Sequence, residues 1–187
     1  MRFQVLLNQK RKEEITYSDL LETDEWKECI AKIIKSQSPY CTKCGHSESF
    51  FYNGKHIATI RSESLFGFYQ GERADIEEEY FFESEKNIYL HVHHKHYILG
   101  RLPWEYSNEE LTTLCNWCHW EIHQNQKIKV YQQTSHGLEE VNFTPCSRCS
   151  GAGVFPEYSH VQSGICFRCS GTRYEELIDK PKSNWFQ

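Results

Sequence analysis

The sequence lacks long apolar stretches. The mean hydropathy of its 187 residues is -0.70, and no window approaches the run of about 18 apolar residues that a transmembrane helix needs. The first residues, MRFQVLLNQKRKEE, contain only a short apolar run and no small-residue cleavage site, unlike a secretory signal peptide. We therefore expect no membrane span and a cytoplasmic, reducing location.

An excess of positive charge is also absent. The formal net charge is -5, which argues mildly against nucleic-acid-binding proteins as a class. Acidic side chains gather in residues 45–85, which hold Glu48, Glu63, Glu72, Asp75, Glu77, Glu78, Glu79, Glu83 and Glu85 against Lys55, Arg61 and Arg73. This acidic segment is either a solvated strand or turn edge, or a surface that contacts a protein partner or weakens nonspecific DNA binding.

Cysteine, by contrast, is abundant. Eight of the nine cysteines fall in four C-x-x-C pairs: Cys41/Cys44, Cys115/Cys118, Cys146/Cys149 and Cys166/Cys169. In an intracellular chain this spacing indicates metal binding rather than disulfides, and two pairs make one tetrahedral zinc site. The sequence therefore predicts two structural zinc ions. Cys29 stands alone among apolar neighbours and is expected to be a small buried residue.

The chain predicts an α+β fold. Residues 1–15 are expected to form a short strand or arm, and residues 17–36 a helix that begins at Ser18 or Thr23 and ends before Pro39. Aromatic and β-branched residues predict several antiparallel strands between residues 50 and 100, with a hairpin turn at YNGK. Residues 107–126 are expected to be helical, and IKVYQQ to form a strand.

Histidines and cysteines are concentrated in two later segments of the sequence. The stretch LHVHHKHYILG contains His91, His93, His94 and His96, and after a loop it is followed by LTTLCNWCHWEIH. In the second segment His119 and His123 are four residues apart and share one helix face. The thiolates beside them can point to a structural zinc while these two histidines point back toward the strand.

This order of residues resembles the HNH endonucleases, whose ββα-metal fold runs from C-x-x-C through a strand ending in His-His to L-x-x-L-C-x-x-C-H. The resemblance covers about residues 23–125, with Cys41-x-x-Cys44, Val92-His93-His94 and Leu111-x-x-Leu114-Cys115-x-x-Cys118-His119. It implies a ββα-metal core, elaborated by a strand-rich antiparallel insertion, that hydrolyses DNA phosphodiester bonds.

The resemblance also implies a role for each residue. His94 is similar to the general base that activates water, His93 and His119 to the ligands of a catalytic divalent metal, and His123 to a further ligand or a phosphate contact. The first structural zinc is assigned to Cys41, Cys44, Cys115 and Cys118. Because imidazole ligands make the catalytic site soft, we expect it to accept Mn, Ni or Zn as well as Mg. His91 and His96 match no position of the family and are expected to line a polar strand face.

One position departs from the family. Glu110 stands where an asparagine commonly orients the base. A carboxylate at this position can orient His94 by accepting a hydrogen bond from its second ring nitrogen, and it would raise the pKa of His94. It can equally mean a reduced or altered activity.

A second cysteine module follows a boundary near residues 134–144. Its repeats, CSRCSGAG and CFRCSGTR, resemble the zinc knuckles of DnaJ-type proteins, except that Arg173 replaces the last glycine. The resemblance implies one zinc held by Cys146, Cys149, Cys166 and Cys169. Interleaved basic and aromatic residues suit contact with a DNA backbone, and the alternative is a small structural cap.

The predicted organisation is an HNH nuclease domain over residues 1–135, a zinc-knuckle module over 140–175 and a flexible tail over 176–187. Two alternatives to the nuclease stay open. One is a noncatalytic, zinc-dependent module that binds nucleic acid or protein on an HNH scaffold. The other is a DnaJ-like thiol or chaperone module, although no J-domain signature is present.

Overall fold

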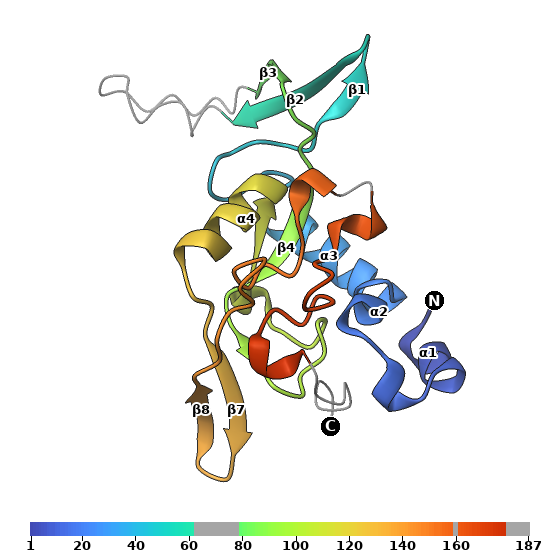
Figure 1. Cartoon of the computed structure of the whole chain (residues 1–187). Coiled ribbons are helices and arrows are strands. Elements are labelled where there is room, and N and C mark those ends of the chain that lie inside the picture. Colours follow the sequence, from blue (N-terminus) through green and yellow to red (C-terminus); the bar gives the residue numbers. More distant parts are fainter. Residues whose placement is uncertain (62–78, 159–160, 179–187) are drawn as a thin grey trace.

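The computed structural model describes residues 1–61, 79–158 and 161–178. The fold is mixed α+β, with small sheets and few helices. A three-stranded sheet stands at one end of the molecule and a long hairpin at the other, as Figure 1 shows. Much of the predicted acidic segment (residues 62–78) and most of the predicted tail (residues 179–187) lie outside the described residues.

The N-terminal residues form a helix, so the prediction of a strand or arm there was wrong. Helix α1 spans Phe3–Gln9, and its Leu6 is 1% exposed in a cluster that also contains Phe3 and Leu7. These apolar residues are spaced by three and four, which places them on one face of a helix. An apolar run this short is ambiguous between strand and helix when periodicity is the only guide.

The single helix predicted for residues 17–36 is two helices. Helix α2 spans Tyr17–Leu21 and helix α3 spans Asp24–Gln37. The Thr23 hydroxyl separates them, because it accepts the N–H three residues later at 3.4 Å and so caps α3. Helix α3 ends two residues before Pro39, as the sequence predicts.

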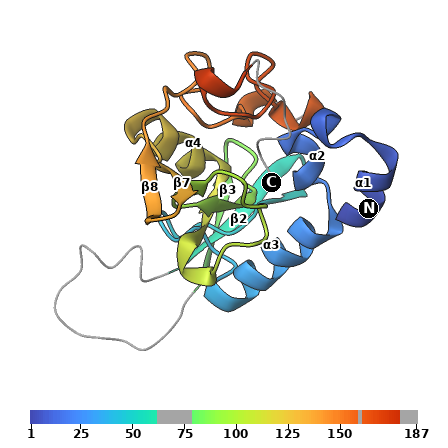
Figure 2. The ribbon, with the colours of Figure 1, turned by 90° about the horizontal axis from the view of Figure 1, so that it is seen from below.

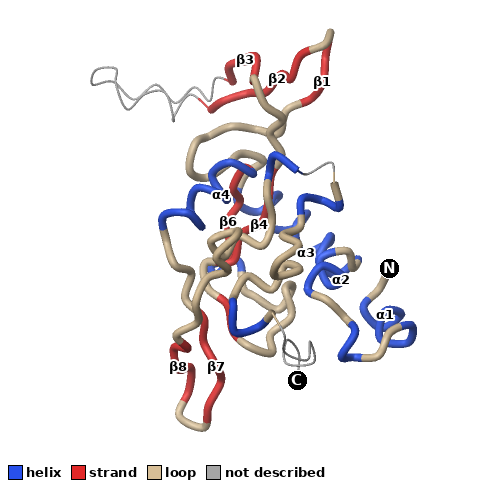
Figure 3. The backbone as a smooth tube through the Cα atoms, viewed as in Figure 1, coloured by secondary structure: helices blue, strands red, loops and turns tan. Residues whose placement is uncertain are grey.

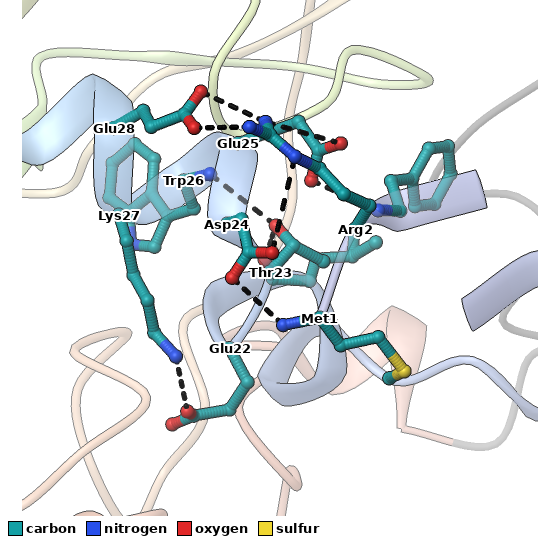
Figure 4. A network of polar contacts seen from close by, with 11 residues as sticks. Met1, Arg2, Glu22, Thr23, Asp24, Glu25, Trp26, Lys27 and Glu28 are labelled. Carbon is teal, nitrogen blue, oxygen red and sulfur yellow. Dashed lines mark hydrogen bonds and ion pairs between the residues drawn. The ribbon is translucent and has the colours of Figure 1, made fainter. Parts of the chain in front are cut away.

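Exposed ion pairs hold the first residues against the start of α3, as Figure 4 shows. The terminal amine donates to Asp24 Oδ1 at 2.8 Å, and Arg2 Nη1 donates to Glu28 Oε2 at 2.9 Å. The backbone N–H of Phe3 also donates to Glu25 Oε2 at 2.9 Å. Exposed pairs of this kind contribute about 0–1 kcal/mol each, so they orient the N-terminal segment more than they stabilise the fold.

The end sheet contains strands β1 (Phe50–Tyr52), β2 (Lys55–Arg61) and β3 (Glu79–Ser84), all antiparallel. Asn53 and Gly54 join β1 to β2 with φ angles of 48° and 79°. A two-residue hairpin turn with φ positive at both positions favours the Asn-Gly pair. The YNGK stretch therefore forms the hairpin that the sequence predicts.

The centre of the molecule is two strands followed by a helix. Strand β4 (Leu90–His94) pairs antiparallel with β6 (Leu111–Cys115), and helix α4 (Asn116–Asn125) follows β6 directly. The helix predicted for residues 107–126 is thus a 3-10 turn at Asn108–Glu110, then β6, then α4. The prediction was wrong for residues 111–115, whose β-branched threonines favour a strand.

Opposite faces of β4 meet different partners. Val92, together with Leu111 of β6, packs against Trp26 and Ile33 of α3. Residues that alternate with Val92 along the strand point the other way, so His93 faces α4. The three elements therefore place a histidine of the strand against histidines of the helix.

A second three-stranded sheet follows in the chain. Strand β5 (Tyr97–Ile98) pairs parallel with β7 (Val130–Thr134), and β7 pairs antiparallel with β8 (Gly137–Val141). The IKVYQQ stretch thus contains a strand, as the sequence predicts, and β8 lies within the boundary region that the sequence analysis expected between two domains.

Residues 144–178 are called the knuckle module below, and the described part of this module is mostly loop, as Figure 3 shows. They contain 3-10 turns at Pro156–Tyr158, Gln162–Gly164 and Glu175–Leu177. Tyr174 and Leu177 are buried in one cluster with Tyr97, Ile128 and Val130. The module therefore shares a core with the preceding residues. In Figure 2 it lies along one side of the molecule and α3 along the opposite side.

Within the described ranges, no helix combines the length and the apolar character needed to cross a lipid bilayer.

Candidate functional site

Three groups of side chains in the described residues are arranged so that they can hold metal ions. Two are four-cysteine clusters that can bind a metal ion such as zinc, and the third consists of three histidines. In each group the candidate ligand atoms all lie within 4.8 Å of one another.

The first cluster joins distant parts of the chain. Cys41 and Cys44 come from the loop after α3, whereas Cys115 ends β6 and Cys118 lies in the first turn of α4. The Sγ atoms of Cys44 and Cys115 are 3.8 Å apart. Four sulfurs at about 2.3 Å from a tetrahedral zinc are separated by about 3.8 Å, so the spacing fits that ion. A metal here ties the loop after α3 to the junction of β6 and α4.

The second cluster is built from two copies of one turn. Cys146, Cys149, Cys166 and Cys169 are 0–1% exposed, and the Sγ atoms of Cys149 and Cys169 are 3.7 Å apart. A hydrogen bond with the Cys149 thiol lowers the pKa of Cys169, which favours the thiolate that a zinc ion binds. The structure thus brings together the same four cysteines that the sequence analysis assigned to the second zinc.

The third group brings β4 and α4 together. The ring of His93 lies 5.1 Å from that of His119 and 5.2 Å from that of His123, and the two helical rings are 4.8 Å apart. We call these three residues the histidine trio. They are 4%, 7% and 4% exposed.

Two ring nitrogens of the histidine trio lack a partner. Nδ1 of His93 and Nε2 of His123 are buried and make no hydrogen bond in the structure. Buried polar atoms are normally satisfied, so unpaired nitrogens in a group whose candidate ligand atoms lie within 4.8 Å of one another indicate an ion between them. Burial lowers the pKa of His93 to about 4 and that of His123 to about 2, so at pH 7 both rings are neutral, the form that binds metal.

His94 lies on the opposite face of β4 from the trio. Its ring stacks on Trp26 at 5.2 Å and meets Tyr106 edge-on at 4.5 Å. Its Nε2 is 2.9 Å from the carbonyl oxygen of Pro103, which sets Nε2 as the donor and leaves the lone pair on Nδ1. Burial lowers the pKa of His94 to about 3, so the ring is neutral at pH 7.

Glu110 does not orient His94, contrary to the sequence analysis. Its Oε1 is 3.0 Å from His96 Nε2 and 3.1 Å from Arg101 Nη1, and its Oε2 accepts the N–H of Ser107 at 2.8 Å. The carboxylate therefore caps the turn before β6 and pairs with a residue that we expected to be a bystander. The Pro103 carbonyl takes the orienting position beside His94.

Two further residues lie near the trio without being grouped with it. His91, on the same face of β4 as His93, stacks on His119 with ring centroids 5.4 Å apart. Arg173 of the knuckle module contributes a positive charge that lowers the pKa of His93, His119 and His123 further, after the larger effect of burial. The sequence analysis noted Arg173 as a departure from the knuckle pattern and counted it among the interleaved basic residues that suit contact with DNA, but it did not place Arg173 near the histidines.

Comparisons of this chain with protein-family models, with curated proteins and with solved structures find no match.

Proposed function

We propose that this protein is a metal-dependent endonuclease of the HNH type that hydrolyses DNA phosphodiester bonds. The observation that carries the proposal is the histidine trio, because an antiparallel pair of strands followed by a helix brings His93, His119 and His123 within reach of one ion. The two four-cysteine clusters fit structural zinc ions, and zinc thiolate sites suit the reducing location that the sequence predicts.

The trio has the chemistry of a catalytic metal site. A divalent ion held there would supply positive charge for a nonbridging phosphate oxygen and for the leaving oxygen. Three neutral imidazoles leave further coordination positions for ligands other than protein. Because imidazole is softer than carboxylate, the site favours Mn, Ni or Zn over Mg in affinity.

His94 has the features of a general base. Its protonated Nε2 is held by the Pro103 carbonyl, so Nδ1 is the nitrogen that accepts a proton from water. The stacked Trp26 ring fixes the plane of the imidazole. Arrival of a negatively charged phosphate raises the pKa of a nearby histidine, which moves the buried His94 toward the range useful for catalysis.

A second candidate function follows from burial. The histidine trio is only 4–7% exposed, and His94 is 3% exposed within an aromatic cluster. A site this enclosed also suits a third structural metal in a noncatalytic binding module. The two functions differ in whether the protein cleaves DNA when the trio is loaded with metal.

Cleavage of supercoiled plasmid tests the proposal. The zinc-containing protein is incubated with plasmid and Mg, Mn, Ni or Zn, with EDTA as a control, and nicked and linear products are quantified. We expect cleavage that is lost in His119→Ala and reduced roughly 10²- to 10⁴-fold in His94→Ala, the usual contribution of a general base. The exposed His136 in the turn between β7 and β8 provides the matched control, His136→Ala, with unchanged cleavage.

For this comparison, His119→Ala and His94→Ala must retain the zinc content and melting temperature of the wild type. Equal cleavage by His94→Ala and wild type would remove His94 as the base. Failure of the wild type to cleave with any of the four metals, although calorimetry shows one bound at the trio, would instead establish the noncatalytic candidate.

A further inference from the structure

Arg173 stands at the position where the first knuckle repeat has a glycine, Gly153. The two knuckles have the same conformation, with φ of 52° and 48° at Ser150 and Ser170 and of 77° and 73° at Gly153 and Arg173. A residue with a side chain is strained at such an angle, and strained residues that persist concentrate at functional sites. Only the second repeat carries a side chain there, so its position is informative.

The guanidinium of Arg173 is buried between two aromatic rings. Its Cζ lies 4.2 Å from the centre of the Tyr17 ring and 4.8 Å from that of the Tyr97 ring. The residue is 9% exposed, and its Nε makes no hydrogen bond. No ion pair in the described part of the chain includes it. Hydrogen bonds with the side chains of Tyr17 and Tyr97 also act on the guanidinium. Both tyrosines are uncharged at pH 7, so they hold the guanidinium plane and do not neutralise its charge.

The backbone of Arg173 lies near His123, with Gly151 next to both residues. Its carbonyl accepts the N–H of Cys146 at 2.7 Å, and a Cβ placed on Gly151 would lie 3.9 Å from that carbonyl and 3.8 Å from His123 Nδ1. Its charge also acts on His94, whose ring is 5.7 Å from that of Tyr97. Arg173 therefore lies close enough for its charge to act both on the trio and on His94.

The charges of this region do not balance without a further group. The three histidines of the trio are neutral. A divalent ion bound to them would therefore add two positive charges to the one on Arg173, or about three in total within an enclosed site. A buried charge without an oppositely charged partner is costly, so this surplus of positive charge favours the binding of an anion. A guanidinium presents paired N–H donors that fit the oxygens of a phosphate.

We propose that Arg173 binds the phosphate on which the metal centre acts, with its unpaired Nε–H donating to a nonbridging oxygen. This inference rests on the proposed function and deepens it, because it makes the knuckle module a part of the active site. Since Nε is enclosed, the phosphate enters through a local opening of the module. The second zinc then serves to position a residue that contacts the substrate.

Binding of inorganic phosphate to the manganese-loaded protein tests this assignment. Manganese in the trio broadens the phosphorus resonance of a phosphate bound beside it, and calorimetry gives the affinity. We expect wild-type protein to bind phosphate and Arg173→Met to lose roughly 10- to 100-fold in affinity, the range for a lost charge-assisted hydrogen bond. Arg173→Lys should have an intermediate affinity, because lysine keeps the positive charge but lacks the paired N–H donors of the guanidinium.

Two controls separate contact from structure. Arg148→Met removes an exposed arginine from the first knuckle and should leave phosphate affinity unchanged. Arg173→Gly restores the residue of the first repeat, relieves the strained φ, and should lose phosphate binding while keeping zinc and manganese content. Equal phosphate affinity in wild type, Arg173→Met and Arg173→Gly at equal manganese occupancy would overturn the proposal, as would the absence of binding to the wild type.

The two proposals fail in different ways. Phosphate that binds through Arg173 in a protein that never cleaves plasmid would contradict the nuclease and leave the anion site in place. Cleavage with unchanged KM and kcat in Arg173→Met would contradict the role of Arg173 and leave the nuclease in place.

Discussion

Replacement of Cys169 by serine should unfold the knuckle module while the rest of the protein stays folded. The described part of the module has no sheet of its own, and few apolar side chains lie next to its cysteines: Trp120 from α4, with Phe155 and Ile178. Its turns are instead organised around the four sulfurs. Short backbone hydrogen bonds surround the cluster; for example, the N–H of Ser170 donates to the carbonyl oxygen of Cys166 at 2.7 Å.

The expected size of the effect follows from this composition. Full burial of a large apolar side chain contributes about 1.5–3 kcal/mol, so three partly buried ones supply less than about 9 kcal/mol. A structural zinc contributes on the order of 10–16 kcal/mol. Loss of one thiolate therefore removes the larger part of what orders the knuckle module, apart from Tyr174 and Leu177, which are held in the core with Tyr97 and Val130. The first cluster lies in a separate core with Ala58, Ile88 and Leu114 and should keep its metal.

Hydrogen exchange combined with zinc analysis measures this effect. We expect one zinc fewer per chain and rapid exchange at the knuckle amides of Cys169→Ser, with α3, β4 and β6 still protected. Cys29→Ser is the matched control, because this cysteine lies in α3 outside both clusters, and both readouts should match the wild type. Knuckle amides that remain protected after the zinc is lost would refute the reasoning.

Two smaller changes test how the central elements are held. Asn116→Ala removes a 1%-exposed side chain that accepts from the N–H of Tyr89 and donates to the carbonyl of Asn87, both at 3.2 Å; we expect a loss of about 1–3 kcal/mol in urea unfolding, and an unchanged midpoint would contradict it. Thr23→Ala removes the cap of α3 and should cost about 1 kcal/mol in the same assay, whereas Thr23→Ser should cost less.

Cysteine spacing was the part of the sequence that predicted the site best. The C-x-x-C pairs come together in the two groups that the family resemblances implied, since two residues between cysteines place both sulfurs on one side of a turn. His93, His119 and His123 also converge, because an alternating strand and a four-residue helical interval set which face each side chain takes.

Local patterns failed where tertiary packing decided the outcome. The LTTLC stretch was predicted as helix from its neighbours, but it forms β6 because β4 offers it a paired edge. The carboxylate of Glu110 reaches His96 because the turn before β6 points it away from His94. The approach of Arg173 to the trio depends on how the knuckle module docks, through Tyr174 and Leu177, and sequence spacing carries no information about that docking.

Anomalous diffraction from crystals grown with zinc and manganese tests the central claim most directly. The account predicts zinc at the two cysteine clusters and manganese among His93, His119 and His123, bound through Nδ1 of the first and Nε2 of the last. The same crystals soaked with phosphate should show it between the manganese and Arg173. Absence of manganese from the trio, in protein that cleaves DNA only when manganese is present, would contradict the account.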